Sequence, residues 1–140
     1  MTNRRPKPKL LCSFGYAWEG LCYVIRSERN VRIHLCIATA VLFVSAWLQL
    51  STIEWAIIIM AISLVFAGEM INTAVELTID LVVSDSNTLA KGAKDVAAAT
   101  VLVTALAAAI MGFLILGPRL WRKILAMGTQ AHLYLSTTKV

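Results

Sequence analysis

Two glutamates stand at helical spacing in or at the edge of a predicted membrane-spanning segment. Glu69 follows fourteen nearly unbroken apolar residues, Trp55 to Gly68, and Glu76 comes seven residues later. A charged side chain at membrane depth costs a few kcal/mol or more unless it faces a partner or a water-filled cavity. The two carboxylates therefore indicate a functional site, and their chemistry suits proton transfer or the binding of a divalent cation.

Other polar residues share the helical face of these glutamates. At about 100° per residue, Glu76 lies about 20° from Glu69, and Asp80 lies about 20° to the other side. Thr73 and Asn72 are about 40° and 60° away. Glu69 and Glu76 are about 10 Å apart along the axis, too far to act as a close pair on one atom. Glu76 is placed to meet a group from the cytoplasm and Glu69 a group from the bilayer, while a solvated surface position remains open for Asp80.

A magnesium-bound nucleotide can bridge the two carboxylates. Carboxylates hold Mg²⁺ through a few ligands while the phosphates supply others. Lys94 and Asp95 flank the start of the last apolar span, where a lysine can neutralise phosphate charge. The alternative for this dipeptide is an interfacial anchor and a helix cap. The chain has no GxxxxGK[ST] sequence, which excludes nucleotide binding through a P-loop.

The composition is that of a small integral membrane protein. Of 140 residues, 59% are hydrophobic and 15% charged, and the mean hydropathy is +0.74. Three apolar segments are long enough, or nearly so, to cross a hydrocarbon core that needs roughly 20 helical residues. Three segments cannot close a β-barrel, so we expect an all-α fold with spans at about 32–50, 53–83 and 94–117. The net charge of +5 lies in the flanks of these spans and indicates contact with lipid headgroups rather than nucleic acid.

An amphipathic helix is predicted between a basic segment, residues 1–9, and the first span. Apolar residues recur at spacings of three and four from Leu10 to Ile25, which predicts a surface helix at about 10–29. Glu28 falls on its apolar face and should point at the helix bundle. The alternative is a helix end at which Arg29 and Arg32 solvate Glu28.

The distribution of basic residues predicts the orientation. Seven Lys and Arg residues precede the first span, none lies between the first two spans, and two lie between the second and third. Lys and Arg are enriched in the loops on the cytoplasmic side of a membrane protein, so the N-terminus and the second loop are expected there. Gly117 and Pro118 are expected to end the third span. The C-terminal tail, 118–140, would then place four basic residues on the opposite side, contrary to the positive-inside rule. We assign no function to this tail.

Three sequence segments resemble one family. GEMINTAVELTIDL and AKGAKDVAAATVL, preceded by SFGYAWEGLCYVIRSERNVRIHL, are similar to the small prokaryotic diacylglycerol kinase and undecaprenol kinase family of integral membrane enzymes. The resemblance covers about Ser13 to Gly117, and ExxNTxxE and AKD are its specific motifs. The ERN-x-RIH run is more similar to the undecaprenol kinase branch. Two departures are His34, where some members have an acidic residue, and the tail, which exceeds the usual end.

The resemblance implies an ATP-dependent, Mg²⁺-requiring lipid kinase that acts on undecaprenol or, as the alternative, on diacylglycerol. It implies a homotrimer in a bacterial inner or plasma membrane, with active sites that are shared between subunits and face the cytoplasm. Glu69 would be the general base for the lipid hydroxyl, and Glu28 and Glu76 would be the Mg²⁺ ligands. The residues implied at the nucleotide are Tyr16, Gly20, Glu28, Asn72, Glu76, Lys94 and Asp95, with Thr73 and Asp80 in support.

Two other functions remain open from the residues. A proton or cation pathway would use Glu69 and Glu76 as a relay in a small oligomeric channel, with ion flux and no ATP consumption. A non-catalytic membrane anchor would make His34 a candidate haem ligand. A lone histidine beside Arg32 at the start of a span is more often an interfacial residue.

Overall fold

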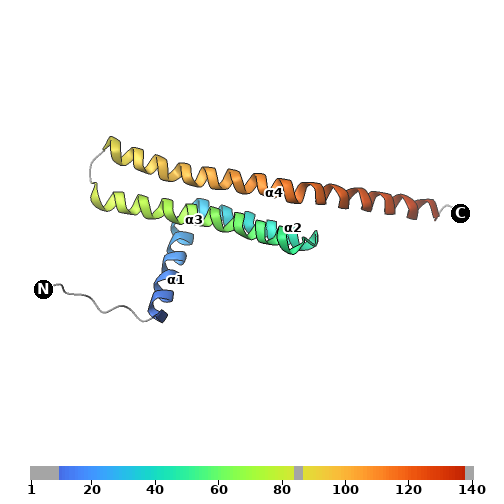
Figure 1. Ribbon diagram of the computed structural model, residues 1–140, viewed down its shortest axis with the longest axis horizontal. Helices are drawn as coiled ribbons and strands as arrows, with labels where there is room; N and C mark the ends of the chain where they lie inside the picture. Colours follow the sequence, from blue (N-terminus) through green and yellow to red (C-terminus); the bar gives the residue numbers. More distant parts are fainter. Residues whose placement is uncertain (1–9, 84–86, 138–140) are drawn as a thin grey trace.

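The described chain, residues 10–83 and 87–137 of the computed structural model, consists of four α-helices (Figure 1). They are α1 (Leu10–Ser27), α2 (Arg29–Trp47), α3 (Thr52–Val82) and α4 (Thr88–Thr137). The last three are each long and apolar enough to cross a membrane. The expected all-α membrane fold, with three spans and an N-terminal helix, is confirmed. The basic segment 1–9 lies outside the described residues.

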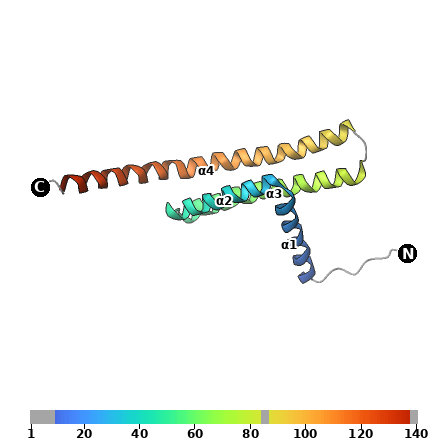
Figure 2. The ribbon, with the colours of Figure 1, turned by 180° about the vertical axis from the view of Figure 1, so that it is seen from behind.

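The three spans form an elongated bundle from which α1 projects. Figures 1 and 2 show α3 and α4 side by side and antiparallel, with α2 along α3 and α1 at a steep angle to them. The angle arises at Glu28, whose extended backbone (φ −96°, ψ 121°) separates α1 from α2. The expected surface helix 10–29 therefore ends earlier, at Ser27, because Glu28 is the N-cap of the next helix.

A tight hairpin joins α2 to α3. Gln49 has a left-handed backbone (φ 54°), and the amides of Gln49 and Leu50 donate to carbonyls in the last turn of α2 at 3.1 and 3.3 Å, which is a Schellman motif. Ser51 then caps α3 in a capping box with Glu54, whose Oε2 accepts from the Ser51 amide at 2.7 Å. Both motifs join residues that lie a few positions apart in the sequence.

Small and apolar side chains at a spacing of three and four join the spans. This spacing is typical of helices that pack along their length, and small residues let helices approach closely in lipid. Gly68 of α3 shows the approach, since a Cβ added there would lie 2.9 Å from Thr104 Oγ1 of α4. The residues of the α2 face toward α3 are Val31, His34, Ala38, Val41, Ser45 and Leu48, and those of α3 that are buried are Ile58, Ala61, Val65, Gly68, Glu69 and Thr73.

The expectation that Gly117 and Pro118 end the third span is wrong. The helix α4 begins at Thr88, earlier than residue 94, and continues through Pro118 to Thr137. A proline inside a helix removes one backbone donor and crowds the preceding turn. Ending the helix would free several more backbone groups, which are costly to leave unsatisfied near hydrocarbon. Continuation is therefore the better solution at this membrane depth.

Contacts with the α2–α3 hairpin hold the turn that follows Pro118. Arg119 donates to the two oxygens of Glu54 at 2.8 and 2.6 Å. Lys123 donates to the Trp47 carbonyl, and its Nζ lies 4.3 Å from the centroid of the Trp47 ring. These contacts give a structural role to two of the basic residues that run against the positive-inside pattern.

Candidate functional site

Glu69 is buried between the spans. Its side chain is 2% exposed, and α3 directs the carboxylate toward α2, where Oε1 lies 3.3 Å from His34 Nε2. The distance fits an ion-pair contact, but Glu69 Oε1 has no hydrogen-bond partner in the described chain. A buried carboxylate oxygen without a hydrogen bond destabilises the fold. Its position here indicates a role in function.

Asn72 and Glu76 continue the polar face of Glu69 along α3. Asn72 Nδ2 donates to Glu76 Oε1 at 2.8 Å, while Asn72 Oδ1 is buried and has no hydrogen-bond partner among the described residues. The Thr73 hydroxyl is buried and donates to the Glu69 carbonyl at 3.0 Å. Thr73 thus supports the helix backbone, whereas Asn72 and Glu76 offer oxygen acceptors.

Glu28 approaches the same region from the junction of α1 and α2. Its side chain makes no capping hydrogen bond with α2. The sequence left open a helix end at which arginines solvate Glu28. In the structure the Arg32 guanidinium instead donates to the Arg26 carbonyl at 3.0 Å. The helix α1, which Glu28 directly follows, contacts α3. We call this group the carboxylate end of the bundle; its members are Glu28, Glu69, Asn72 and Glu76.

Lys94, Asp95 and Asp80 form a separate group of charges. Lys94 Nζ contacts Asp80 Oδ1 and so joins α4 to α3. Asp95 pairs with Lys91 at 2.8 Å, and both side chains are exposed. Asp80, Lys91 and Lys94 line a pocket of about 380 Å³ near the ends of α3 and α4. Within the described residues of one chain, neither Lys94 nor Asp95 makes a hydrogen bond or ion pair with the carboxylate end.

The nucleotide residues expected on α1 lie on its exposed surface. Tyr16 is 65% exposed, and a Cβ added at Gly20 would meet open space. The helix contacts α2 and α3, with Val24 as a buried residue. A single chain therefore does not enclose Tyr16 or Gly20 in a site with Glu69 and Glu76.

His34 is the site residue that sequence reasoning missed. The sequence predicted an interfacial position for His34 and did not predict its contact with Glu69. Its side chain is 23% exposed, and it lies three residues after the buried Val31 and four before the buried Ala38. That spacing on the buried face of α2 is the signal in the sequence that indicates an inward histidine.

The residues of the carboxylate end fit a magnesium ion that is held together with a nucleotide. Within residues 10–83 and 87–137, no group of three or more His, Cys, Asp or Glu side chains could hold a metal ion alone. Mg²⁺ is usually bound through one or two carboxylates, with waters and substrate phosphates as the other ligands. Glu76, beside the unpaired oxygen of Asn72, supplies hard oxygen ligands of this kind.

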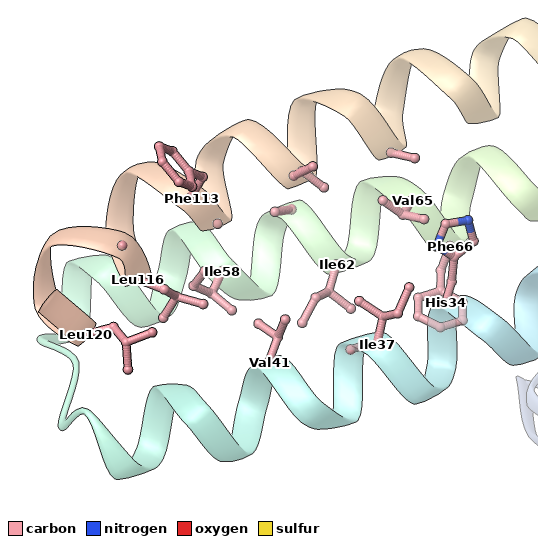
Figure 3. A pocket seen from close by; sticks show the side chains of 17 residues that line it. His34, Ile37, Val41, Ile58, Ile62, Val65, Phe66, Phe113, Leu116 and Leu120 are labelled. Carbon is pink, nitrogen blue, oxygen red and sulfur yellow. The ribbon is translucent and has the colours of Figure 1, made fainter. Parts of the chain in front are cut away.

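An apolar cavity of about 530 Å³ extends along α2, α3 and α4 from His34 toward the hairpin. Figure 3 shows His34 and Phe66 at one end of this cavity and Leu116 and Leu120 at the other. Its wall is formed by aliphatic and aromatic side chains and by small residues of α4. The cavity has the polarity to accept a hydrocarbon chain, and its polar end lies beside the buried carboxylate.

Known proteins match most of the chain. Residues 15–116 match the family described as prokaryotic diacylglycerol kinase. The undecaprenol kinase of Bacillus subtilis is 44% identical over 118 residues, which cover 84% of this chain and 96% of that protein. The diacylglycerol kinase of a Synechocystis strain is 44% identical over 114 residues, covering 81% and 65%. That of Escherichia coli is 28% identical over 102 residues, covering 73% and 84%. The chain therefore belongs to the prokaryotic diacylglycerol kinase family, and it is a multi-pass membrane lipid kinase.

Proposed function

We propose that the protein transfers the γ-phosphoryl group of ATP to the hydroxyl of undecaprenol, with diacylglycerol as the alternative substrate. The observation that carries this proposal is the buried Glu69 carboxylate, whose Oε1 has no hydrogen-bond partner in the described chain and contacts His34 at the end of an apolar cavity. Undecaprenol is preferred because the match spans 96% of the undecaprenol kinase and 65% of the Synechocystis diacylglycerol kinase. The ERN-x-RIH run supports the same choice.

Glu69 is proposed as the general base. Its carboxylate takes the proton of the lipid hydroxyl as the hydroxyl oxygen forms a bond to the γ-phosphorus. The bond from that phosphorus to the bridging oxygen breaks, and ADP leaves. Positioned general bases contribute about 10²-fold to 10⁴-fold to such reactions. The buried site also limits access of water, which would otherwise compete as the acceptor.

Glu28 and Glu76 are proposed to hold Mg²⁺, and Asn72 fixes the Glu76 carboxylate through its amide hydrogen bond. When bound, Mg²⁺ neutralises charge on the phosphate oxygens. The contact of α1 with α3 supports this assignment, because Glu28 directly follows α1 and Glu76 lies on α3. It keeps the metal-binding carboxylates separate from the base that contacts the lipid.

The nucleotide site is proposed to be completed by neighbouring protomers of a homotrimer. A single chain leaves Tyr16 and Gly20 exposed and pairs Lys94 and Asp95 with other charges. Shared active sites would bring these four residues to ATP. The seven basic residues among the first 32 of the chain support a bacterial inner or plasma membrane location with the carboxylate end toward the cytoplasm.

The test is phosphoryl transfer from labelled ATP, with Mg²⁺, into undecaprenol and diacylglycerol presented separately in mixed micelles. We expect label in both lipids or in undecaprenol alone, with the faster rate for undecaprenol. A faster rate for diacylglycerol would reverse the substrate assignment. An absence of label in either lipid, from folded and oligomeric protein, would contradict the proposal, and ion flux in liposomes would then favour the ion pathway.

A further inference from the structure

We propose that Arg122 and Lys123 bind the phosphate of an anionic phospholipid in the membrane leaflet beside the α2–α3 hairpin. Both residues lie in the part of α4 that follows the family match, which ends at residue 116. They run against the positive-inside pattern, and the proposed kinase reaction does not use them. The proposal therefore concerns a second lipid contact, separate from the site of phosphoryl transfer.

The helix α4 leaves the hydrocarbon core close to Arg122. It has 50 residues and at about 1.5 Å per residue is about 75 Å long, whereas the core of a bilayer is about 30 Å thick. Figure 1 shows α4 continuing past the α2–α3 hairpin. Tryptophan is enriched at the membrane–water interface, and three of the four tryptophans lie in this region: Trp47 at the end of α2, Trp55 at the start of α3 and Trp121. Arg122 and Lys123 therefore lie at the depth of lipid headgroups.

The cations of this region outnumber its carboxylates. Arg119 is paired with Glu54 through two hydrogen bonds. The sequence has no Asp or Glu after Asp95, so the rest of α4 offers Arg122 and Lys123 no carboxylate. Within residues 10–83 and 87–137, neither side chain makes a salt bridge. Their charges therefore suit an anion that comes from outside the chain.

Both side chains keep hydrogen-bond donors for such an anion. Lys123 Nζ donates to the Trp47 carbonyl and lies 4.3 Å from the centroid of the Trp47 ring, which holds the side chain in place and leaves its other ammonium hydrogens. In the described chain, Arg122 makes one side-chain hydrogen bond, from Nε to the Pro118 carbonyl at 3.3 Å. Its terminal N–H groups remain for phosphate oxygens, which guanidinium groups bind in a bidentate manner.

The helical positions of the basic residues favour one shared anion. At about 100° per residue, Arg122 and Lys123 lie about 100° apart around α4, and Arg119, one turn earlier, lies between them. The sector between the two side chains therefore also carries the charge of Arg119. A phosphate has oxygens on several sides and can accept from Arg122 and Lys123 together.

The apolar side chains beside Arg122 favour a lipid over free phosphate. Leu114 and Pro118 are exposed, and their spacing of four residues places them in one row with Arg122, one and two turns toward the core. This row offers an acyl chain an apolar surface directly below the phosphate. Inorganic phosphate has no group that would use it.

The test measures the binding of phosphatidylglycerol and phosphatidylcholine, with identical acyl chains, to the purified full-length protein by native mass spectrometry. The double variant Arg122→Gln/Lys123→Met removes both charges and keeps a flexible apolar side chain over Trp47. One Lys or Arg near an anionic lipid contributes about fivefold in affinity. We expect the double variant to bind phosphatidylglycerol about 20-fold more weakly and phosphatidylcholine as the wild type does. Arg4→Gln/Arg5→Gln removes the same charge elsewhere and should change either affinity by less than about twofold.

The other outcomes would overturn the proposal. Equal phosphatidylglycerol affinities of the wild type and the Arg122→Gln/Lys123→Met protein would remove the site. Equal losses in this variant and in the Arg4→Gln/Arg5→Gln control would show a general attraction of charges. Inorganic phosphate that displaces phosphatidylglycerol at a similar concentration would exclude a lipid as the specific occupant.

A second variant covers the case in which the double variant does not fold. Arg122→Gln alone leaves the contact of Lys123 with Trp47 intact and should weaken phosphatidylglycerol binding about fivefold. An unchanged affinity in this variant would overturn the role of Arg122. These measurements need no phosphoryl transfer, so their failure leaves the kinase proposal intact, and a lack of kinase activity leaves this inference intact.

Discussion

The two ends of the bundle differ in how their polar groups are paired. At the hairpin end, which comprises Trp47–Glu54 with Arg119 and Lys123, the charged groups have partners. Glu54 accepts from Arg119 and Ser51, and Lys123 contacts the Trp47 carbonyl and ring. At the carboxylate end, Glu69 Oε1 and Asn72 Oδ1 are buried without partners. In the described residues, Ser45 Oγ is the other such atom, and it carries no charge.

This difference separates stability from function within one small protein. Buried polar groups are normally hydrogen-bonded, because an unsatisfied group keeps its desolvation cost. The hairpin end follows that rule and ties α4 to the turn between α2 and α3. The carboxylate end departs from it at the positions where a lipid hydroxyl and a metal–nucleotide complex are proposed to bind.

The largest effect on activity is expected from Glu69→Gln. The amide keeps the shape of the side chain but cannot act as the base, so kcat should fall about 10²-fold to 10⁴-fold. Thermal stability should not decrease, because the substitution removes a charge from a buried position. Lipid phosphorylation and thermal unfolding of the purified protein measure the two quantities. Normal turnover in this variant would remove Glu69 from the role of base.

A smaller and different effect is expected from Glu28→Gln and Glu76→Gln. Each variant should raise the Mg²⁺ concentration for half-maximal rate by about 10-fold or more, because loss of a carboxylate weakens a site built on few protein ligands. Titration of the rate with Mg²⁺ at fixed ATP measures the change. Glu54→Gln, a carboxylate substitution at the hairpin end, is the control and should leave this requirement unaltered. Equal Mg²⁺ curves for all three variants would refute the ligand assignment.

Gly68→Ala probes the packing that positions the carboxylate end. The added Cβ would meet Thr104 Oγ1 at 2.9 Å, so α3 and α4 must separate slightly and displace the neighbouring Glu69. Small displacements of catalytic groups are costly, and we expect kcat to fall about 10-fold with a lower melting temperature. Gly128→Ala, where the added Cβ meets open space, is the control. Identical behaviour of the two alanine variants would show that this close contact does not position Glu69.

The smallest effect on activity is expected at the hairpin end. Arg119→Leu and Glu54→Gln should each lower the melting temperature and leave kcat within about twofold of the wild type, because the ion pair they break is remote from the carboxylate end. The double variant should lose less stability than the sum of the two single losses, since both remove one interaction. Thermal unfolding of the four proteins measures the coupling. A large loss of turnover in either single variant would contradict the separation of the two ends.

Structural features that are set by residues close together in the chain can be predicted from the sequence. The hairpin turn and the Ser51 cap are local features of this kind, because their hydrogen bonds join residues a few positions apart. The polar face of α3 was also predictable, since helical geometry alone places Glu69, Asn72 and Glu76. The break at Glu28 was missed by two residues, because helix periodicity does not reveal where one helix ends and the next begins.

Features that depend on distant residues were not predictable in the same way. The contact of His34 with Glu69 requires the register of α2 along α3, which one sequence does not give. The continuation of α4 through Pro118 is accompanied by a pair between Arg119 and Glu54, residues far apart in the chain. Local rules for proline argue for a helix end there, and tertiary contacts favour continuation.

The left-handed backbone of Gln49 marks a position at which one substitution could raise the stability of the protein. Glycine is the usual residue at this position of a Schellman motif, and a side chain there costs about 1 kcal/mol or more. A designer could therefore make the hairpin more robust for purification or crystallisation by a single change remote from the carboxylate end. Robustness and turnover would then be adjustable independently in this enzyme.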